Sequence, residues 1–249
     1  MLSFLRRCVS FRDYGTSAAV ITGLSSGHSR ATQEGSASVR AVRSLRFQRF
    51  VLAPFAPVAV GMECVVQGII ESKHVRALAE LIEGMTGARE EKLDLHQLVY
   101  RNAPNIGAIP CEVRLECPLN CTPPIWTMTH VGGAMRGAGA DQLACLVRSI
   151  VRVRASPSVI HLVPAIGLRL DHELIRRGSA FDFAHRSHAM RLEAFAPLRL
   201  PRQHAVSDAQ PLPSLAGLHV VEVTAAAAAA ETYTETAAAL NSFAETIAP

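Results

Sequence analysis

Lysine, aromatic residues and long apolar runs are scarce in this sequence. Only Lys73 and Lys92 are lysines among the 25 basic residues, and the chain holds one Trp and three Tyr. Its hydrophobic content of 49% must therefore form a largely aliphatic core. The best apolar stretch, FVLAPFAPVAVGM at 50–62, is short and contains two prolines, so the sequence predicts no membrane span.

Cysteine is too sparse for a disulfide framework, with six residues in 249. This predicts free thiols in a reducing compartment. The segment CEVRLECPLNC holds Cys111, Cys117 and Cys121, and His96 and His130 are further candidate zinc donors. A structural zinc site usually shows close Cys pairs, commonly two of them, whereas here Cys111 and Cys117 are separated by five residues and no second pair exists. The sequence favours buried free thiols over zinc.

Motifs of nucleotide and hydrolase chemistry are also missing. The Gly-rich segment THVGGAMRGAGAD at 129–141 could cradle a phosphate at a helix N-terminus. It lacks the Gly-Lys-Ser/Thr end of a P-loop and the glycine pattern of dinucleotide sites, so a flexible connection is favoured. His-Glu-x-x-His does not occur, and residues 61–249, the part expected to fold, contain no Gly-x-Ser-x-Gly. The sequence predicts no catalytic residue, no metal site and no cofactor.

The net charge differs in sign between the N-terminal fifty residues and the rest of the chain. Residues 1–50 carry eight Arg against two acids, a net charge of +6, while the remaining 199 residues have a net charge of −2. The part expected to fold lacks a basic surplus, so no direct nucleic-acid binding is expected. The Arg- and Ser-rich residues 1–60 predict a disordered extension, with an organellar transit peptide or a wrongly assigned gene start as alternatives. Residues 61–249 are expected to form a single domain.

Hydrophobic periodicity predicts a chain of strands with a few helices. Helices are predicted from Ser72 to Gly84 or Gly87, from about Asp141 through Ile150, and from a cap at Thr224 through the alanine run to Ile247. A short helix at 156–167 is expected to kink or end at Pro164. The strands follow one another without regular helical crossovers, so the sheet should be mostly antiparallel and the fold α+β, a barrel or strongly curved sheet. Predicted strands are 63–70, 92–101, 111–117, 125–131, 168–175, 188–195 and 218–223.

The segment GLRLDHELIRRGSAFDF at 167–183 places an acid, a histidine and an acid side by side. In a regular strand His172 lies on one face, and Asp171 and Glu173 lie on the other. The three side chains therefore cannot converge on one ion without a bulge. We expect His172 to be partly buried and hydrogen-bonded rather than a metal ligand.

A second alternating segment holds Glu112, Arg114 and Glu116 on one face of a strand. Barrel-type triphosphate enzymes use rows of glutamates to hold metal ions inside a tunnel. Other strands of this chain supply single glutamates only, so a solvated strand face is favoured. A tunnel-type phosphohydrolase that depends on Glu112 or Glu116 stays as the alternative.

The order of these pieces resembles one family, Mediator complex subunit 18, from the head module of the RNA polymerase II coactivator. The resemblance covers about residues 62–249 and is weak at 101–124 and 197–216. Four segments carry it: MECVVQGIIESKHVRALAELIEGMTG with a Gln-Gly turn at Gly68, PIWTMTHVGG led by Trp126 and followed by ACLVRSIV, IGLRLDHELIRRGSAF with Gly167, Asp171, His172, Glu173 and Gly178, and VVEVTAAAAAAETYTETAAALNSFAETI.

The resemblance implies a single multistranded β-barrel with flanking helices, including a C-terminal helix. It implies a nuclear, non-enzymatic scaffold for regulated RNA polymerase II transcription, without a cofactor. The implied partners are Mediator subunit 20 as a heterodimer, the C-terminal helix of Mediator subunit 8, and the polymerase machinery. The implied barrel is akin to RNA 5′-triphosphatases without their activity, and a metal-dependent phosphohydrolase of that type is the alternative function. Gly178 is expected to permit a tight backbone bend.

Overall fold

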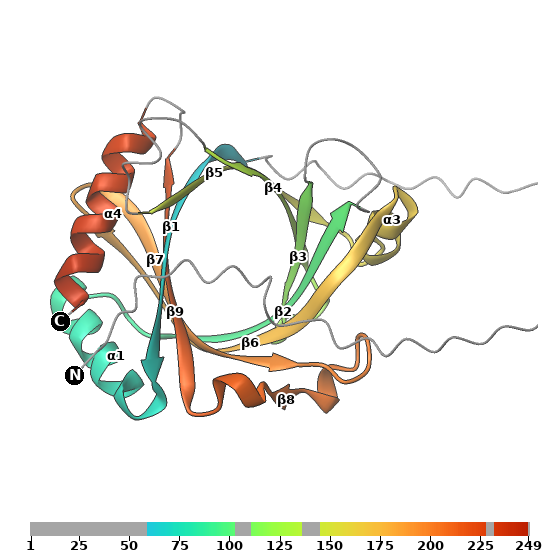
Figure 1. Cartoon of the computed structure of the whole chain (residues 1–249), viewed down its shortest axis with the longest axis horizontal. Coiled ribbons are helices and arrows are strands. Elements are labelled where there is room, and N and C mark those ends of the chain that lie inside the picture. Colours follow the sequence, from blue (N-terminus) through green and yellow to red (C-terminus); the bar gives the residue numbers. More distant parts are fainter. Residues whose placement is uncertain (1–58, 103–110, 136–144, 228–231, 249) are drawn as a thin grey trace, which may run out of the picture. The chain divides into compact units, whose positions relative to one another are not determined.

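The strands of this chain form one antiparallel sheet that closes on itself (Figure 1). The computed structural model describes residues 59–102, 111–135, 145–227 and 232–248. The order around the barrel is β6-β2-β3-β4-β5-β1-β9-β7, and pairing of β7 with β6 closes it. The strands are β1 (Ala59–Glu71), β2 (Glu91–Asn102), β3 (Glu112–Pro118), β4 (Trp126–Ala134), β5 (Leu146–Ala155), β6 (Leu168–His185), β7 (His188–Arg199) and β9 (Leu218–Ala227), with the short β8 (Gln210–Pro211) added to β7. The expected α+β barrel is confirmed.

Three α-helices pack on the outside of the barrel in the described part of the chain. Figure 1 shows α1 (Val75–Thr86) and α4 (Tyr233–Ile247) on one side and α3 (Val159–Ala165) on the other. Short 3-10 turns, η2 (Ser72–His74), η3 (Val206–Asp208) and η4 (Pro213–Leu215), complete the connections. Among the described residues, none of the helices has the length and apolar character needed to span a bilayer.

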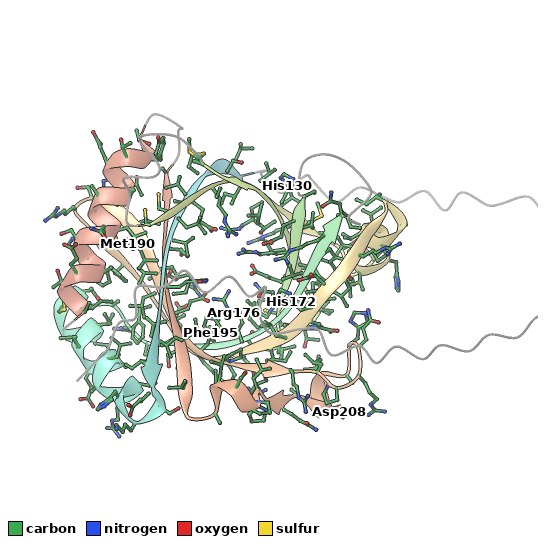
Figure 2. All side chains as sticks on the ribbon, viewed as in Figure 1. His130, His172, Arg176, Met190, Phe195 and Asp208 are labelled. Atoms are coloured by element: carbon green, nitrogen blue, oxygen red, sulfur yellow. The ribbon has the colours of Figure 1, made fainter. Side chains whose placement is uncertain are left out.

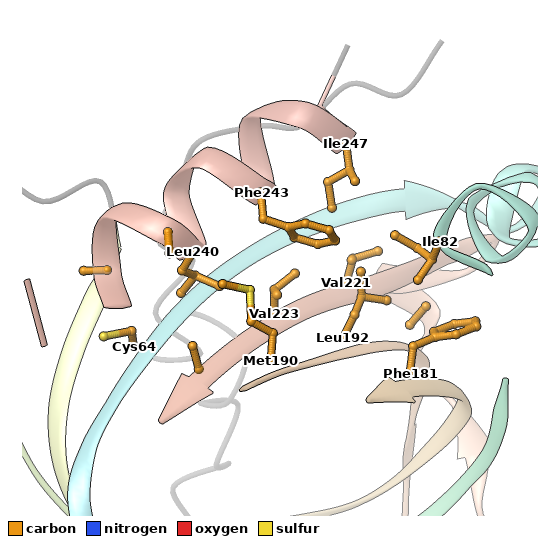
Figure 3. Packing of buried hydrophobic residues seen from close by; sticks show 14 of the residues in the cluster. Cys64, Ile82, Phe181, Met190, Leu192, Val221, Val223, Leu240, Phe243 and Ile247 are labelled. Atoms are coloured by element: carbon orange, nitrogen blue, oxygen red, sulfur yellow. The ribbon is translucent and has the colours of Figure 1, made fainter. Parts of the chain in front are cut away.

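Two apolar clusters fix the helices to the barrel wall. Under α4, Leu240, Phe243 and Ile247 point at Met190 and the strands below (Figure 3). Under α3, Val159 and Val163 pack on the outward side chains of β2, β3 and β4. Because side chains alternate along a strand, each strand that buries apolar residues under a helix points its other side chains into the barrel.

The predicted helix from Asp141 through Ile150 is wrong where the structure describes it. Residues from Leu146 onward form β5, which pairs with β1 and β4 on its two sides. Leu146, Val147 and Ile150 fit one helix face by spacing, but the segment LVRSIVRVRA is rich in β-branched residues and gains two ladders as a strand. Residues 141–144 lie outside the described part.

The first three residues of the alanine run, Ala225–Ala227, form the end of a strand despite the high helix propensity of alanine. Thr224 does not cap a helix, because β9 continues to Ala227. Ala225 pairs with Cys64 of β1 and with Met190 of β7, and these two ladders outweigh the local preference of alanine for helix. The helix α4 is defined from Tyr233.

Helix α1 buries Leu78 and Ile82 and ends at Gly87, as predicted. Gly87 has a φ of 68°, the left-handed conformation that glycine adopts readily at a helix C-terminus. The other predicted end, Gly84, is wrong because this residue lies inside the helix, where an added Cβ would meet no atom within 4 Å. Glycine therefore costs stability at position 84 without serving a steric need.

We expect Gly84→Ala to raise the free energy of unfolding by about 0.5–1 kcal/mol, because alanine lowers the entropy of the unfolded chain. Denaturant melts followed by circular dichroism would measure the change. Gly87→Ala is the matched control and should destabilise the protein, since alanine is strained at positive φ. Equal responses of the two variants would contradict this account of α1.

Candidate functional site

The acidic and histidine side chains of 171–173 are separated by a β-bulge. Val99 of β2 pairs with His172, while the next residue, Tyr100, pairs with Leu170. Asp171 is therefore the extra residue of β6 and faces no residue of β2. The expected alternation is wrong at this point, and the bulge decides where each of the three side chains goes.

His172 is partly buried and hydrogen-bonded, as the sequence predicts. Its Nδ1 lies 2.7 Å from Asp171 Oδ2, so the two side chains meet instead of pointing apart. Asp171 also forms an ion pair with Arg101 at 3.1 Å. The bulge thus directs Asp171 toward the end of β2 and ties it into a charged network.

Glu173 lies apart from that pair, between two other histidines. Its Oε1 accepts a hydrogen bond from His96 Nε2 at 2.6 Å and lies 3.0 Å from His204 Nδ1. The backbone amide of His204 donates to the same carboxylate, with both oxygens at 3.1 Å. Burial by itself raises the pKa of Glu173, but the hydrogen bonds from His96 and the His204 amide outweigh it, so the pKa is lowered.

The histidines of this cluster come from distant parts of the chain. His96 is in β2, and His204 is in the segment between β7 and β8. Sequence reasoning named His96 only as a donor for the cysteine segment and missed His204. No local signal could have joined them, because residues 96, 173 and 204 meet only when β6 has paired with both β2 and β7.

The glycine and tryptophan positions of the family resemblance have structural roles. Gly68 is not in a turn: it is buried within β1, opposite Val221 of β9. Trp126 begins β4, is buried, and places its ring edge-on to that of His96, with centroids 5.5 Å apart. Gly167 has a φ of 94° and links α3 to β6.

Gly178 does not make the expected bend either. It lies in the middle of β6, opposite Phe195 of β7. An added Cβ would lie 2.0 Å from the carbonyl oxygen of Ala194 and 2.8 Å from Phe195 Cα. Glycine is needed here because the backbone of β7 approaches too closely for any side chain.

A cavity of about 630 Å³ lies inside the barrel and is lined from all eight strands. Charged residues contribute much of its surface, with five arginines and five acids: Arg114, Arg148, Arg152, Arg176, Arg191, Glu63, Glu116, Asp182, Glu193 and Glu222. Arg114 and Glu116 of β3 are among these residues, so the solvated face expected for Glu112, Arg114 and Glu116 points into the barrel and not to its outer surface. The opposite face of β3 is buried under α3.

The side chain of Arg176 points into this polar interior (Figure 2), where it pairs with two glutamates. Its Nη2 lies 2.6 Å from Glu193 Oε2 and 2.8 Å from Glu222 Oε1, and its guanidinium lies 4.0 Å above the ring of Phe195. Only 7% of the Arg176 side chain is exposed. Burial raises the pKa of Glu222, but Arg176 and a hydrogen bond from Gln67 outweigh that effect and lower it.

The remaining carboxylates of the interior are also engaged. Glu116 accepts a hydrogen bond from Gln97 at 2.7 Å, and Glu63 pairs with Arg152 at 3.2 Å. Glu112 accepts from Arg101 at 3.0 Å and from Arg114 at 2.9 Å. Burial nevertheless raises the pKa of Glu63, whereas the pKa of Glu112 is lowered because its two arginines outweigh burial. The Gln97–Glu116 and Glu63–Arg152 pairs link neighbouring strands. These polar contacts also occupy carboxylate oxygens that a metal ion would need as ligands.

The cysteine segment does not gather into a metal site. Cys111 and Cys117 are partly or fully buried free thiols, and Cys121 is an exposed one. His130 is exposed on β4. Among the residues that the structure describes, the one group of three metal-binding side chains consists of His96, Glu173 and His204. The expectation of free thiols in this segment is met, except that Cys121 is not buried.

Comparison with known proteins agrees with the sequence resemblance. The chain is 45% identical to Mediator of RNA polymerase II transcription subunit 18 from Arabidopsis thaliana over 190 residues, which span 76% of this chain and 85% of the plant protein. The chain belongs to the Mediator subunit 18 family. The Xenopus laevis member is 28% identical over 171 residues, covering 68% of this chain and 77% of that protein. No protein-family model matches the sequence.

A solved structure shows the same fold. A chain of the Schizosaccharomyces pombe Mediator head module superimposes with a TM-score of 0.54, at 16% identity, over 74% of this chain and 92% of that one. At this identity the likeness concerns the fold alone. The closed barrel with its helices is thus an architecture already observed in a Mediator assembly.

Proposed function

We propose that this protein is a non-enzymatic subunit of the Mediator coactivator complex, a protein-binding scaffold of its head module that supports regulated RNA polymerase II transcription. The observation that carries the proposal is the 45% identity to Arabidopsis Mediator subunit 18 across 85% of that relative. The barrel fold supports it, since a chain of the fission yeast head module has the same fold.

The proposed partners are Mediator subunit 20, as a heterodimer, the C-terminal helix of Mediator subunit 8, and the polymerase machinery. A nuclear location follows from this assembly. Exposed apolar pairs on two helices support a role in binding proteins: Leu81 and Met85 on α1 are 40% and 44% exposed, and Leu162 and Ile166 beside α3 are 55% and 65% exposed. Residues four apart share one helix face, so each pair forms an apolar surface that a partner could bury.

The phosphohydrolase alternative has less support. Its chemistry needs carboxylates that are free to hold metal ions around the substrate phosphates. Each of the interior carboxylates Glu116, Glu193 and Glu222 instead has an arginine or glutamine partner. The interior is therefore better suited to holding the strands together than to catalysis.

Affinity purification tests the proposal. The tagged full chain, expressed in its own cells, should recover Mediator subunits 20 and 8 from nuclear extract, as identified by mass spectrometry. Gly178→Ala, which should destabilise the barrel because its added Cβ forces the β6–β7 ladder to shift, should recover less of both subunits. The proposal would be wrong if the wild-type chain were recovered as a monomer at high concentration, without Mediator subunits.

The same preparation separates the two functions. The scaffold proposal predicts no metal-dependent release of phosphate from triphosphate substrates. A release that Glu116→Gln abolishes, while the variant keeps its circular dichroism spectrum, would favour the phosphohydrolase instead. Residues 1–58 lie outside the described residues, so the extension predicted for residues 1–60 and the single domain at 61–249 stay predictions.

A further inference from the structure

We propose that His96, Glu173 and His204 form a binding site for one divalent first-row metal ion, with zinc as the preferred ion. This inference concerns the outer wall of the barrel and goes beyond the proposed scaffold function. Three donors from three separate parts of the chain, β2, β6 and the segment after β7, converge on one point.

The three donor atoms lie close enough together to bind a single metal ion. One ligand atom from each side chain lies within 4.8 Å of the other two. The side chains of His96 and Glu173 are only 7% and 6% exposed, whereas that of His204 is 40% exposed. The site therefore has two buried ligands that hold their positions and one outer ligand that leaves a path for the ion to enter.

The donor set is one that zinc uses. Two imidazoles and one glutamate bind zinc in metalloproteins, with a water in the fourth position. Bonds of about 2.0–2.2 Å to a tetrahedral ion place neighbouring donors about 3.3 Å apart. The present separations of 2.6 Å and 3.0 Å from Glu173 Oε1 are hydrogen-bond distances. The ion would replace the imidazole protons, and each donor would need to move by less than about 1 Å.

Groups around the cluster already hold the ligands in place. The His204 amide lies 3.1 Å from Glu173 Oε2, so this oxygen can keep its hydrogen bond while Oε1 takes the ion. The Trp126 ring packs edge-on against His96 and limits the directions open to the imidazole. Such outer contacts orient metal ligands and support affinity.

A bound ion would fasten the segment after β7 to the barrel wall. His204 lies in the connection that leads through η3 to β8, and both its backbone amide and its imidazole contact Glu173 of β6. A metal bridge would join this connection to β2 and β6 at once. We expect metal binding to stabilise the protein, because a site assembled only in the folded chain adds its binding free energy to folding.

Zinc binding can be measured on the full chain together with its co-purified partners. After chelator treatment and dialysis, titration with ZnCl₂ followed by calorimetry and elemental analysis should give one added ion per chain and a higher melting temperature. His204→Ala should weaken zinc binding by more than the roughly 10- to 100-fold that follows the loss of an outer-sphere partner. The exposed His161→Ala on α3 is the matched control and should bind as the wild type does.

Two further measurements keep the result unambiguous. Glu173→Gln keeps the shape of the side chain but removes its charge, so it should also lose the ion, and circular dichroism shows whether it folds. Co²⁺ in place of zinc should give a spectrum without thiolate bands. The proposal is overturned if the wild type takes up no stoichiometric zinc, if His204→Ala binds as well as the wild type, or if binding is lost in Cys117→Ser instead.

Discussion

Arg176→Ala should lower the free energy of unfolding by about 3–5 kcal/mol, the cost expected when one partner of a buried ion pair is removed. The substitution would leave Glu193 and Glu222 facing each other inside the barrel without their shared cation. It would also remove the guanidinium that lies over Phe195. Denaturant melts of the full chain followed by circular dichroism would measure the loss.

Arg202→Ala is the matched control for this prediction. Arg202 also pairs with a carboxylate, Asp208, but 77% of its side chain is exposed. Solvent screens such a pair, and its removal should cost less than about 1 kcal/mol. Adding Glu222→Gln to Arg176→Ala should recover part of the stability, because one uncompensated charge disappears. If Arg176→Ala and Arg202→Ala lowered the free energy of unfolding equally, water in the cavity would have to screen the charges of the buried network.

Gly178→Ala should destabilise the protein by about 3 kcal/mol or more, at the upper end of the cost of overpacking. The new Cβ would meet the carbonyl oxygen of Ala194 at 2.0 Å and Phe195 Cα at 2.8 Å. Both atoms belong to the backbone of β7, so no side-chain rotation can relieve the clash. The β6–β7 ladder, which closes the barrel, would have to shift.

Gly133→Ala in β4 separates this clash from a general effect of glycine in strands. An added Cβ at Gly133 meets nothing within 4 Å, so its substitution should change stability by less than about 1 kcal/mol, in the stabilising direction. Melting curves of the two variants, measured side by side, test the difference. The close approach of β6 and β7 would be refuted if both variants unfolded at the same denaturant concentration.

Local pattern was sufficient to predict most elements. Alternation in CEVRLEC and LHVVEV predicts strands; β3 begins one residue into the first segment, at Glu112, and β9 contains the second. Spacing of Leu78 and Ile82 predicts the buried face of α1. The failures at β5 and at Ala225–Ala227 have one cause: segments with acceptable helical patterns became strands because partner strands on both sides offered them hydrogen-bonded ladders.

The sequence by itself determined the family, the alternating faces of the strands and the absence of familiar catalytic motifs from residues 61–249. It could not show which strand face would meet solvent. Glu116 and Glu222 occupy a closed interior because the sheet curls until β6 meets β7, and outward apolar side chains are then covered by helices. Pairing of β6 with β2 and with β7 brings His96, Glu173 and His204 together. Strand alternation is a local property of the backbone, whereas the side that becomes the inside depends on pairing between residues far apart in the chain.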